Sequence, residues 1–304
     1  MARVAHRARS LPSHARPALL EFPLPVTATS ELPEPNSIER WAHDYVLAEE
    51  WADKLRPTAL PERFASTPTP LRIRAPGRGP AFVLSDSGHK STGSSALRSP
   101  LARAKLMHTF LHHELQAAEL MAWAVCAFPE APTALKRGLL AILHDELRHM
   151  RLYAALLEAR GYALGSFPVR DWFWQRVPTV PDMRGFLATL GLGFEGANLD
   201  HASRFAERFR EAGDDEAAEI QARIAREEIP HVRFAARWFR ALSPSPLEGR
   251  ELFEAFRAAL PAPLSPMVMR GRPLARGARA QAGLDERYLD ALEAWEPDPC
   301  APSS

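Results

Sequence analysis

Cysteine is scarce in this sequence, and the little that occurs lies in unrelated places. Only two cysteines are present, Cys126 in an apolar run and Cys300 near the end. Two cysteines so far apart form no disulfide framework and lack the close spacing that a thiolate metal site requires. We therefore expect Cys126 to be a core residue in a protein of the reducing cytoplasm.

The sequence also lacks a long hydrophobic run and a strong excess of charge. The longest apolar candidate, 115–128, is interrupted by Gln116 and Glu119 and falls short of the about 20 apolar residues that span a bilayer. The formal net charge of +1 argues against a surface dedicated to nucleic acid. The first 20 residues carry four arginines and no acid, but no apolar segment follows, so they indicate a basic tail and not a secretory signal.

Proline is abundant and unevenly placed. Many of the 28 prolines lie with serine and arginine in 1–35 and 56–80, which indicates irregular segments that wrap around the rest. Between these segments, Ser37 is suited to cap a single helix over 37–55. The expected parts are an N-terminal extension (1–98), a helical domain (99–243) and a C-terminal extension (244–304) with a helix near 285–295.

The helical domain contains four long segments with apolar residues at helical spacing. They cover 100–128, 132–160, 181–212 and 214–242. Each has roughly 28–32 residues, which corresponds to about 42–48 Å of helix. Short turns join the first to the second and the third to the fourth, so each pair is expected to form an antiparallel hairpin. The connection 161–180 can extend about 66 Å and cross the whole domain. The pattern predicts an all-α, ferritin-like four-helix bundle with one long crossover and irregular terminal extensions.

Two of these helices carry a Glu-x-x-His pair. Glu146 and His149 lie on the second helix, and Glu228 and His231 lie on the fourth. A spacing of three residues puts both side chains on one helix face, one turn apart. One such pair arises readily by chance, but two pairs on alternate helices indicate a metal site in the bundle.

The other two helices should each supply one inward glutamate. The third helix offers Glu195 within an apolar stretch, and the first offers Glu114 or Glu119. The first hairpin turns near residue 130, so Glu114 lies as far before the turn as Glu146 lies after it. Glu119 falls about 7.5 Å nearer the turn. Glu114 is therefore the predicted ligand, with Glu119 as the fallback.

Buried carboxylates repel one another unless cations neutralise them, and two divalent ions would balance four negative charges. Carboxylate oxygen with imidazole nitrogen and no thiolate favours two iron ions, or an iron–manganese pair. The predicted metal ligands are Glu114, Glu146, His149, Glu195, Glu228 and His231. The same six residues are the predicted catalytic residues, and they would act by binding the metal ions and not as acid–base groups.

Four further residues are expected around the ligands. Asp145 and Glu227 each precede a ligand glutamate and can accept the second ring N–H of a ligand histidine. Tyr153 follows His149 by one turn, as a core residue or as a redox-active neighbour. Glu119, if it is not a ligand, belongs to the same surroundings.

The helices near the site contain residues that disfavour regular α-geometry. Gly191, Gly193 and Gly196 weaken the third helix around Glu195. Pro230 cannot donate to the carbonyl four residues before it, so we expect a kink or bulge in the fourth helix between its Glu and His.

Four stretches of the chain resemble a ferritin-like family of bacterial proteins catalogued as domain of unknown function 455. They are HHELQAAELMAWAV (112–125), DWFW (171–174), FEGANLDHA (194–202) and EEIPHVRFAARWF (227–239). The resemblance covers roughly 95–243 and implies a di-metal site without naming a reaction. The chain is similar, more distantly, to the di-iron tRNA hydroxylases; Pro230 departs from the pattern and puts the local geometry of His231 in doubt.

The leading functional interpretation is a non-haem di-iron oxygenase or oxidase. It requires O2, an external electron donor and a substrate that is a small molecule or a modified macromolecule, with a homodimer allowed and neither a membrane nor nucleic acid expected as partner. The extensions at both ends favour an enzyme over a storage protein. The alternatives are iron handling or peroxide detoxification without an organic substrate, and a metal-stabilised interaction module.

Overall fold

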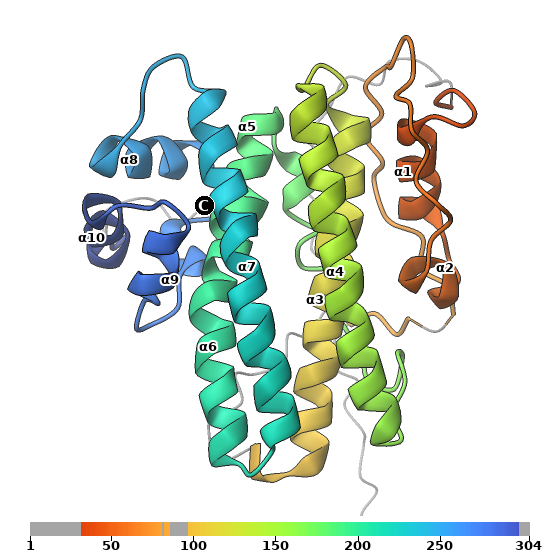
Figure 1. Ribbon diagram of the computed structural model, residues 1–304, viewed down its shortest axis with the longest axis vertical. Coiled ribbons are helices and arrows are strands. Elements are labelled where there is room, and N and C mark those ends of the chain that lie inside the picture. The colour runs from red at the N-terminus through yellow and green to blue at the C-terminus, as the bar shows by residue number, and fades with distance from the viewer. Residues whose placement is uncertain (1–31, 81, 86–96, 298–304) are drawn as a thin grey trace, which may run out of the picture. The chain divides into compact units, whose positions relative to one another are not determined.

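Four long helical segments lie side by side in the middle of the computed structural model, which describes residues 32–80, 82–85 and 97–297 (Figure 1). They are α3 (Pro100–Ala127), α4 (Thr133–Ala159), the consecutive α5 (Met183–Phe186), π-helical η3 (Leu187–Glu195) and α6 (Gly196–Glu211), and α7 (Asp215–Ala241). Their ends agree with the four predicted segments within two residues. Within the described ranges there is no strand, only an isolated bridge between Leu84 and Val169, so the all-α prediction is confirmed.

Capping residues fix where these helices begin. The Ser99 hydroxyl accepts a hydrogen bond from the N–H of Ala102, and Pro100 occupies the first turn of α3. Asp214 accepts from the N–H of Ala217 at the start of α7. The Asp214 carboxylate also pairs with Arg103 of α3 and Arg160 at the end of α4, each at 2.7 Å. One acid therefore caps α7 and joins three helices at the same end.

The third segment departs from α-geometry over η3. Side chains in place of the glycines would have no room there: a Cβ at Gly191 would lie 2.3 Å from the Cβ of Ala235 on α7, and one at Gly193 would lie 2.7 Å from Met269 Sδ. The glycines therefore permit close packing, and their low helix propensity favours the wider turn. The π-helical segment ends at Glu195.

The sequence allowed a kink or a bulge at Pro230. The bulge is wrong, because α7 runs as one α-helix from Asp215 to Ala241 with Pro230 inside it. Pro230 lies on the exposed face of α7. The irregular helix of this region is η3, which packs against α7.

The predicted helix over 37–55 is two helices, α1 (Ile38–Leu47) and α2 (Trp51–Leu55). Ser37 caps α1 as expected, accepting from Arg40 N at 3.1 Å. The break follows from tertiary contacts with the last carbonyls of α1. The N–H of Gly77 donates to the Val46 carbonyl at 2.9 Å, and Lys54 Nζ donates to the same oxygen at 2.8 Å. Because the Val46 carbonyl accepts hydrogen bonds from these two groups and not from a following helical N–H, the helix ends there.

The C-terminal part contains three short helices, of which the sequence predicted one. They are α8 (Gly249–Ala259), α9 (Arg276–Gln281) and α10 (Glu286–Ala294), on the side of α6 and α7 away from α1 (Figure 1). Asp200 of α6 holds this part through a buried ion pair with Arg279 at 2.8 Å. It also accepts hydrogen bonds from the N–H groups of Gly271 and Ala275, both at 2.7 Å.

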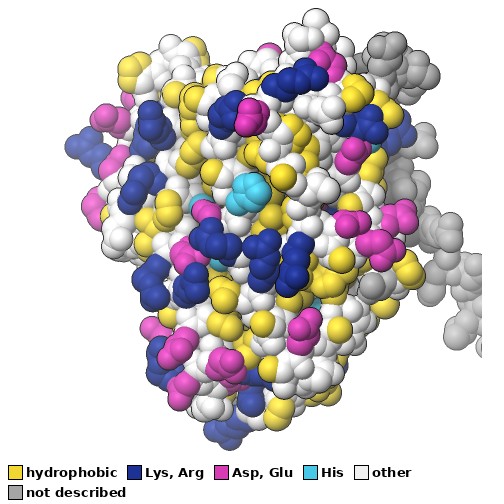
Figure 2. Space-filling model, turned by 45° about the vertical axis from the view of Figure 1, so that its right-hand side comes forward, with side chains coloured by type: hydrophobic (Ala, Val, Ile, Leu, Met, Phe, Trp, Pro, Cys, Tyr) yellow, Lys and Arg dark blue, Asp and Glu magenta, His cyan; other side chains and the backbone are white. Residues whose placement is uncertain are grey.

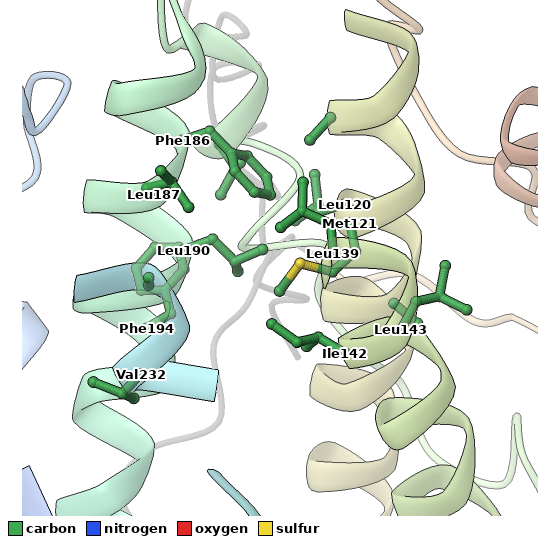
Figure 3. Packing of buried hydrophobic residues seen from close by; sticks show 14 of the residues in the cluster. Leu120, Met121, Leu139, Ile142, Leu143, Phe186, Leu187, Leu190, Phe194 and Val232 are labelled. Atoms are coloured by element: carbon green, nitrogen blue, oxygen red, sulfur yellow. The ribbon is translucent and has the colours of Figure 1, made fainter. Parts of the chain in front are cut away.

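Apolar side chains from α3, α4, α5 and η3 fill the centre. Figure 3 shows Met121 and Leu120 of α3 facing Leu190 and Phe186 across the gap between the ribbons, with Ile142 of α4 beside them. Their burial supplies the main stabilising contribution. Cys126 is buried here, as predicted, and Cys300 lies outside the described residues.

The surface is mixed in charge. On the face seen in Figure 2, a short row of Lys and Arg side chains lies among acidic and apolar ones. Among the helices that the structure describes, none combines the length and apolar character needed to cross a membrane.

Candidate metal centre

All six predicted ligand residues come together at mid-height between the four long helical segments. Their relative exposure is 5% or less, so the cluster is withdrawn from water. Oxygen and nitrogen atoms of these residues form two groups, and within each group the atoms lie within 4.8 Å of one another. One group is Glu114, Glu146, His149 and Glu228, and the other is Glu146, Glu195, Glu228 and His231.

The two groups share Glu146 and Glu228, one from α4 and one from α7. A carboxylate has two oxygens and can therefore bridge two cations. Each group adds one histidine and one further glutamate. Each of the two buried groups could hold a metal ion.

The histidines present Nδ1 to the cluster and Nε2 to an outer carboxylate. His149 Nδ1 lies 3.3 Å from Glu146 Oε2, while its Nε2 lies 3.0 Å from Glu227 Oε2. His231 Nδ1 lies 3.0 Å from Glu228 Oε2, and its Nε2 lies 3.1 Å from Asp145 Oδ2. An Nε2–H donated outward leaves Nδ1 as the ligand atom.

These outer contacts cross between the two helices. Asp145 of α4 holds a histidine of α7, and Glu227 of α7 holds a histidine of α4. Arg148 pairs with both carboxylates, and Arg223 pairs with Glu227 at 2.8 Å. The outer side of the cluster between α4 and α7 is therefore closed by a continuous set of charged hydrogen bonds.

Burial changes the protonation of the terminal glutamates. It raises the pKa of Glu114 well above its ordinary value, and the Glu146 carboxylate raises it further. Burial, and next the charge of Glu228, likewise raise the pKa of Glu195. Both shifts favour the neutral, protonated form of these two carboxyls.

The pKa values of the two histidines and of Glu146, in contrast, are shifted so that the charged form of each group is favoured. Burial lowers the pKa of His149, but its hydrogen bonds with Glu114 and Glu146 outweigh this and raise it to about 12. Burial likewise disfavours the imidazolium of His231, but Glu228 and Asp145 raise its pKa well above the ordinary value. Burial raises the pKa of Glu146, whereas hydrogen bonds with the two histidines bring it well below the usual range.

The donor set fits a pair of divalent ions. Without them, the pKa shifts favour charged histidines and neutral Glu114 and Glu195. With them, four carboxylates balance four positive charges and both histidines can be neutral. Glu146 Oε1 is buried without a hydrogen bond of good geometry, although His231 Nδ1 lies 3.2 Å away. Such an orphaned oxygen is what a missing cation would leave.

Glu119, the fallback ligand, does not join either group. Its buried carboxylate pairs with Lys54 at 2.7 Å and with Arg78 at 2.5 Å, and it accepts from Trp174 Nε1 at 2.8 Å. The expectation that it belongs to the surroundings of the ligands is wrong as well, because these partners come from α2, the segment after it and the crossover. Glu119 instead attaches those segments to α3.

Tyr153 and Asn198 complete the surroundings. Tyr153 is a core residue, as expected, and its hydroxyl accepts a hydrogen bond from Gln221 at 2.5 Å. Burial raises its pKa well above 10.0. Asn198 was not predicted; its Nδ2 donates to Glu228 Oε1 at 3.2 Å. Its position three residues after Glu195 was the available signal, since that spacing shares a helix face.

A cavity of about 490 Å³ reaches the cluster from the side of α3 and α6. Of the six clustered residues, only the terminal Glu114 and Glu195 line it. Its lining includes six aromatic residues, Phe110, Tyr153, Trp172, Phe173, Phe194 and Phe205. The cluster is thus closed on the histidine side and open toward the cavity.

Comparison with known proteins identifies a family whose activity is not known. The family model described as "Protein of unknown function (DUF455)" matches residues 36–290. An uncharacterised protein from Haemophilus influenzae is 27% identical over 195 residues, which are 62% of this chain and 66% of that protein, so the match spans just under two thirds of the relative. No solved structure matches. Because the family model covers most of the chain, the protein belongs to the DUF455 family.

Proposed function

We propose that this protein is a ferritin-like di-iron oxygenase or oxidase that uses O2 to oxidise an organic substrate. The observation that carries the proposal is the pair of ligand groups sharing Glu146 and Glu228, with a cavity that ends at Glu114 and Glu195. Two antiparallel hairpins joined by a long crossover, with a Glu-x-x-His pair on α4 and on α7, support the ferritin-like assignment.

Glu146 and Glu228, which belong to both groups, would hold the two ions together with Glu114, Glu195 and Nδ1 of His149 and His231. Reduced iron bound there would supply the electrons and the Lewis acidity for O2 activation. The two outer carboxylates keep the histidines in the tautomer that leaves Nδ1 free. The aromatic walls exclude water from the open face and orient the substrate toward the terminal carboxylates.

The cavity favours a substrate-oxidising enzyme over iron handling. Iron storage and peroxide removal act on ions or small solutes and need no aromatic chamber of this size. They do need ready exchange with solvent, whereas the ligand residues here are buried. The reaction class that fits best therefore consumes O2, an organic substrate and electrons from an external donor.

The test is metal analysis of anaerobically purified full-length protein, followed by exposure to O2 monitored by absorption and Mössbauer spectroscopy. We expect two iron ions per chain and a single oxidation event in the absence of substrate. Glu228→Gln should lose most bound metal, whereas Glu219→Gln, at an exposed position of the same helix, should retain it.

Other outcomes would identify the alternatives. Repeated loading of many ions per chain would indicate iron handling. Two ions with no reaction toward O2 would indicate a metal-stabilised interaction module. Absence of metal from both the native protein and the reconstituted protein would remove the basis of the proposal.

A further inference from the structure

Three cationic side chains line the cavity on one side of the terminal glutamates. They are Lys105 of α3 and Arg204 and Arg208 of α6, all half-buried. Across the part of the chain that the structure describes, no Asp or Glu oxygen lies within 4.0 Å of their charged nitrogens. In contrast, Arg148, Arg160 and other arginines of the long helices form ion pairs.

The two arginines lie four residues apart on one helix, which places like charges side by side. Both guanidinium groups flank the same ring, with Cζ 5.6 Å from the Phe205 centroid in each case. Burial, and then the charge of Arg208, lower the pKa of Arg204. Arg204 Nε is buried without a hydrogen-bond partner among the described residues. Such a cluster is costly when empty, and a bound anion would offset the cost.

The other polar groups of the cavity do not supply that anion. Among the described residues, Arg204 donates to His201 Nδ1 and to the Arg272 carbonyl and to no carboxylate. The lining His201 does not supply it either, because burial, and next the charge of Arg204, lower its pKa and favour the neutral ring. Among the described residues, Glu114 and Glu195 are the only ones on the lining that carry a carboxyl group.

The helices fix the distance between the cations and the metal centre. Lys105 lies nine residues before Glu114, and Arg204 lies nine residues after Glu195. Since α3 and α6 run in opposite directions (Figure 1), both cations lie toward the same end of the cavity. Nine residues of helix correspond to about 13 Å. Aromatic walls occupy the space between.

We propose that the cavity binds an elongated organic anion, with a carboxylate or phosphate head at Lys105, Arg204 and Arg208 and an apolar body that extends to Glu114 and Glu195. Its role as the substrate class rests on the function proposed above, but its binding does not. The arginine pair offers planar, bidentate donors for either head group. The apolar end is presented to the metal centre.

The test uses isothermal titration of the full-length protein, with and without iron, against decanoate, decyl phosphate, decanol and decyltrimethylammonium, all below their micellar concentrations. We expect at least one of the two anions to bind about ten- to a hundredfold more tightly than decanol, and the cation to bind least. The tighter of the two anions identifies the head group. Equal binding of decanol and both anions, or no binding of either anion, would overturn the proposal.

Variants locate the head group. Arg208→Gln and Lys105→Gln should each reduce the preference for the anion about tenfold while leaving decanol binding unchanged. Arg210→Gln is the control, because Arg210 is exposed on the same helix and does not line the cavity. Circular dichroism of each variant would show that it is folded. An equal loss in the control, or no loss in either cavity variant, would contradict the placement.

The two proposals fail in different ways. If the anion binds but iron-loaded protein never consumes O2, the oxygenase assignment fails and the ligand class remains. If the protein binds two irons and reacts with O2 but shows no preference for the anions, the ligand class alone is wrong.

Discussion

Replacing Glu119 with glutamine tests whether this glutamate of α3 has a structural role, in contrast to Glu114, which is proposed to bind metal. The side chain of Glu119 is fully buried, and its oxygens pair with Lys54 and Arg78. Burial alone would raise its pKa, but Arg78 and Lys54 outweigh burial and lower it, so the group remains a carboxylate. Glutamine keeps its volume and can still accept from Trp174, so the variant removes the charge without opening a cavity.

The magnitude depends on what the lost charge leaves behind. Arg78 retains Asp171 at 2.9 Å, so it keeps a counter-ion. Lys54 is fully buried, and Glu119 is its only ion-pair partner among the described residues. A buried charge that loses its partner costs about 3–5 kcal/mol. That is a large fraction of the roughly 5–15 kcal/mol by which a native domain is stable.

The assay combines urea unfolding with metal content measured by mass spectrometry on the same preparations. Glu119→Gln should lower the free energy of unfolding by about 3–5 kcal/mol and leave two metals per chain at temperatures where it is folded. Glu114→Gln should do the reverse, losing metal while the chelated protein is as stable as the chelated wild type. Adding Lys54→Met to Glu119→Gln should recover most of the stability, because the stranded charge is gone. Metal loss with full stability in Glu119→Gln would show that the register of α3 is misassigned.

Three further outcomes are expected. Asp145→Asn and Glu227→Gln should each weaken metal binding about 10–100-fold in chelator competition, since each orients one ligand histidine; unchanged affinity would make these contacts incidental. The pKa of His149 is raised from 6.5 to about 12, so its stabilisation of the chelated protein is complete below pH 6.5 and is lost as the pH rises toward 12. The melting gap between loaded and chelated protein should therefore widen above neutral pH, and metal uptake should release protons, measurable by calorimetry in two buffers. Pro230→Ala should raise the melting temperature and leave turnover unchanged, because the proline lies inside an uninterrupted helix and costs on the order of 3 kcal/mol there.

The long helices could be predicted from sequence because their signals are local. Apolar periodicity, Pro100 in a first turn and Asp214 as a cap act within a few residues. The short elements could not be predicted in the same way. The end of α1 depends on Gly77, about 30 residues further along the chain, and α9 is held by Arg279 against Asp200. Such contacts override local propensity and leave no periodic trace.

The cluster could be predicted because the two hairpins repeat one pattern. Glu114 and Glu146 are 32 residues apart and Glu195 and Glu228 are 33 apart, so hairpin symmetry alone selected Glu114 over Glu119. The symmetry could not show what Glu119 does, because Lys54 and Arg78 belong to the N-terminal extension. The sequence also did not show which helix is irregular, because glycine and proline both disfavour an α-helix. Only glycine allows the close contact that α7 makes with η3.

The two sides of the cluster therefore differ in their proposed roles. The side of α4 and α7 carries both histidines, their outer carboxylates and Arg148, so it is closed by charged hydrogen bonds and sets how tightly the ions are held. The side of α3 and η3 carries Glu114 and Glu195 at the end of the cavity, so it would decide what approaches the proposed metal ions. Because burial raises the pKa of both terminal carboxyls, metal binding there would promote loss of their protons and change the charge at the inner end of the cavity. We therefore expect metal loading and ligand binding to be coupled through Glu114 and Glu195, the two residues that the cavity and the cluster have in common.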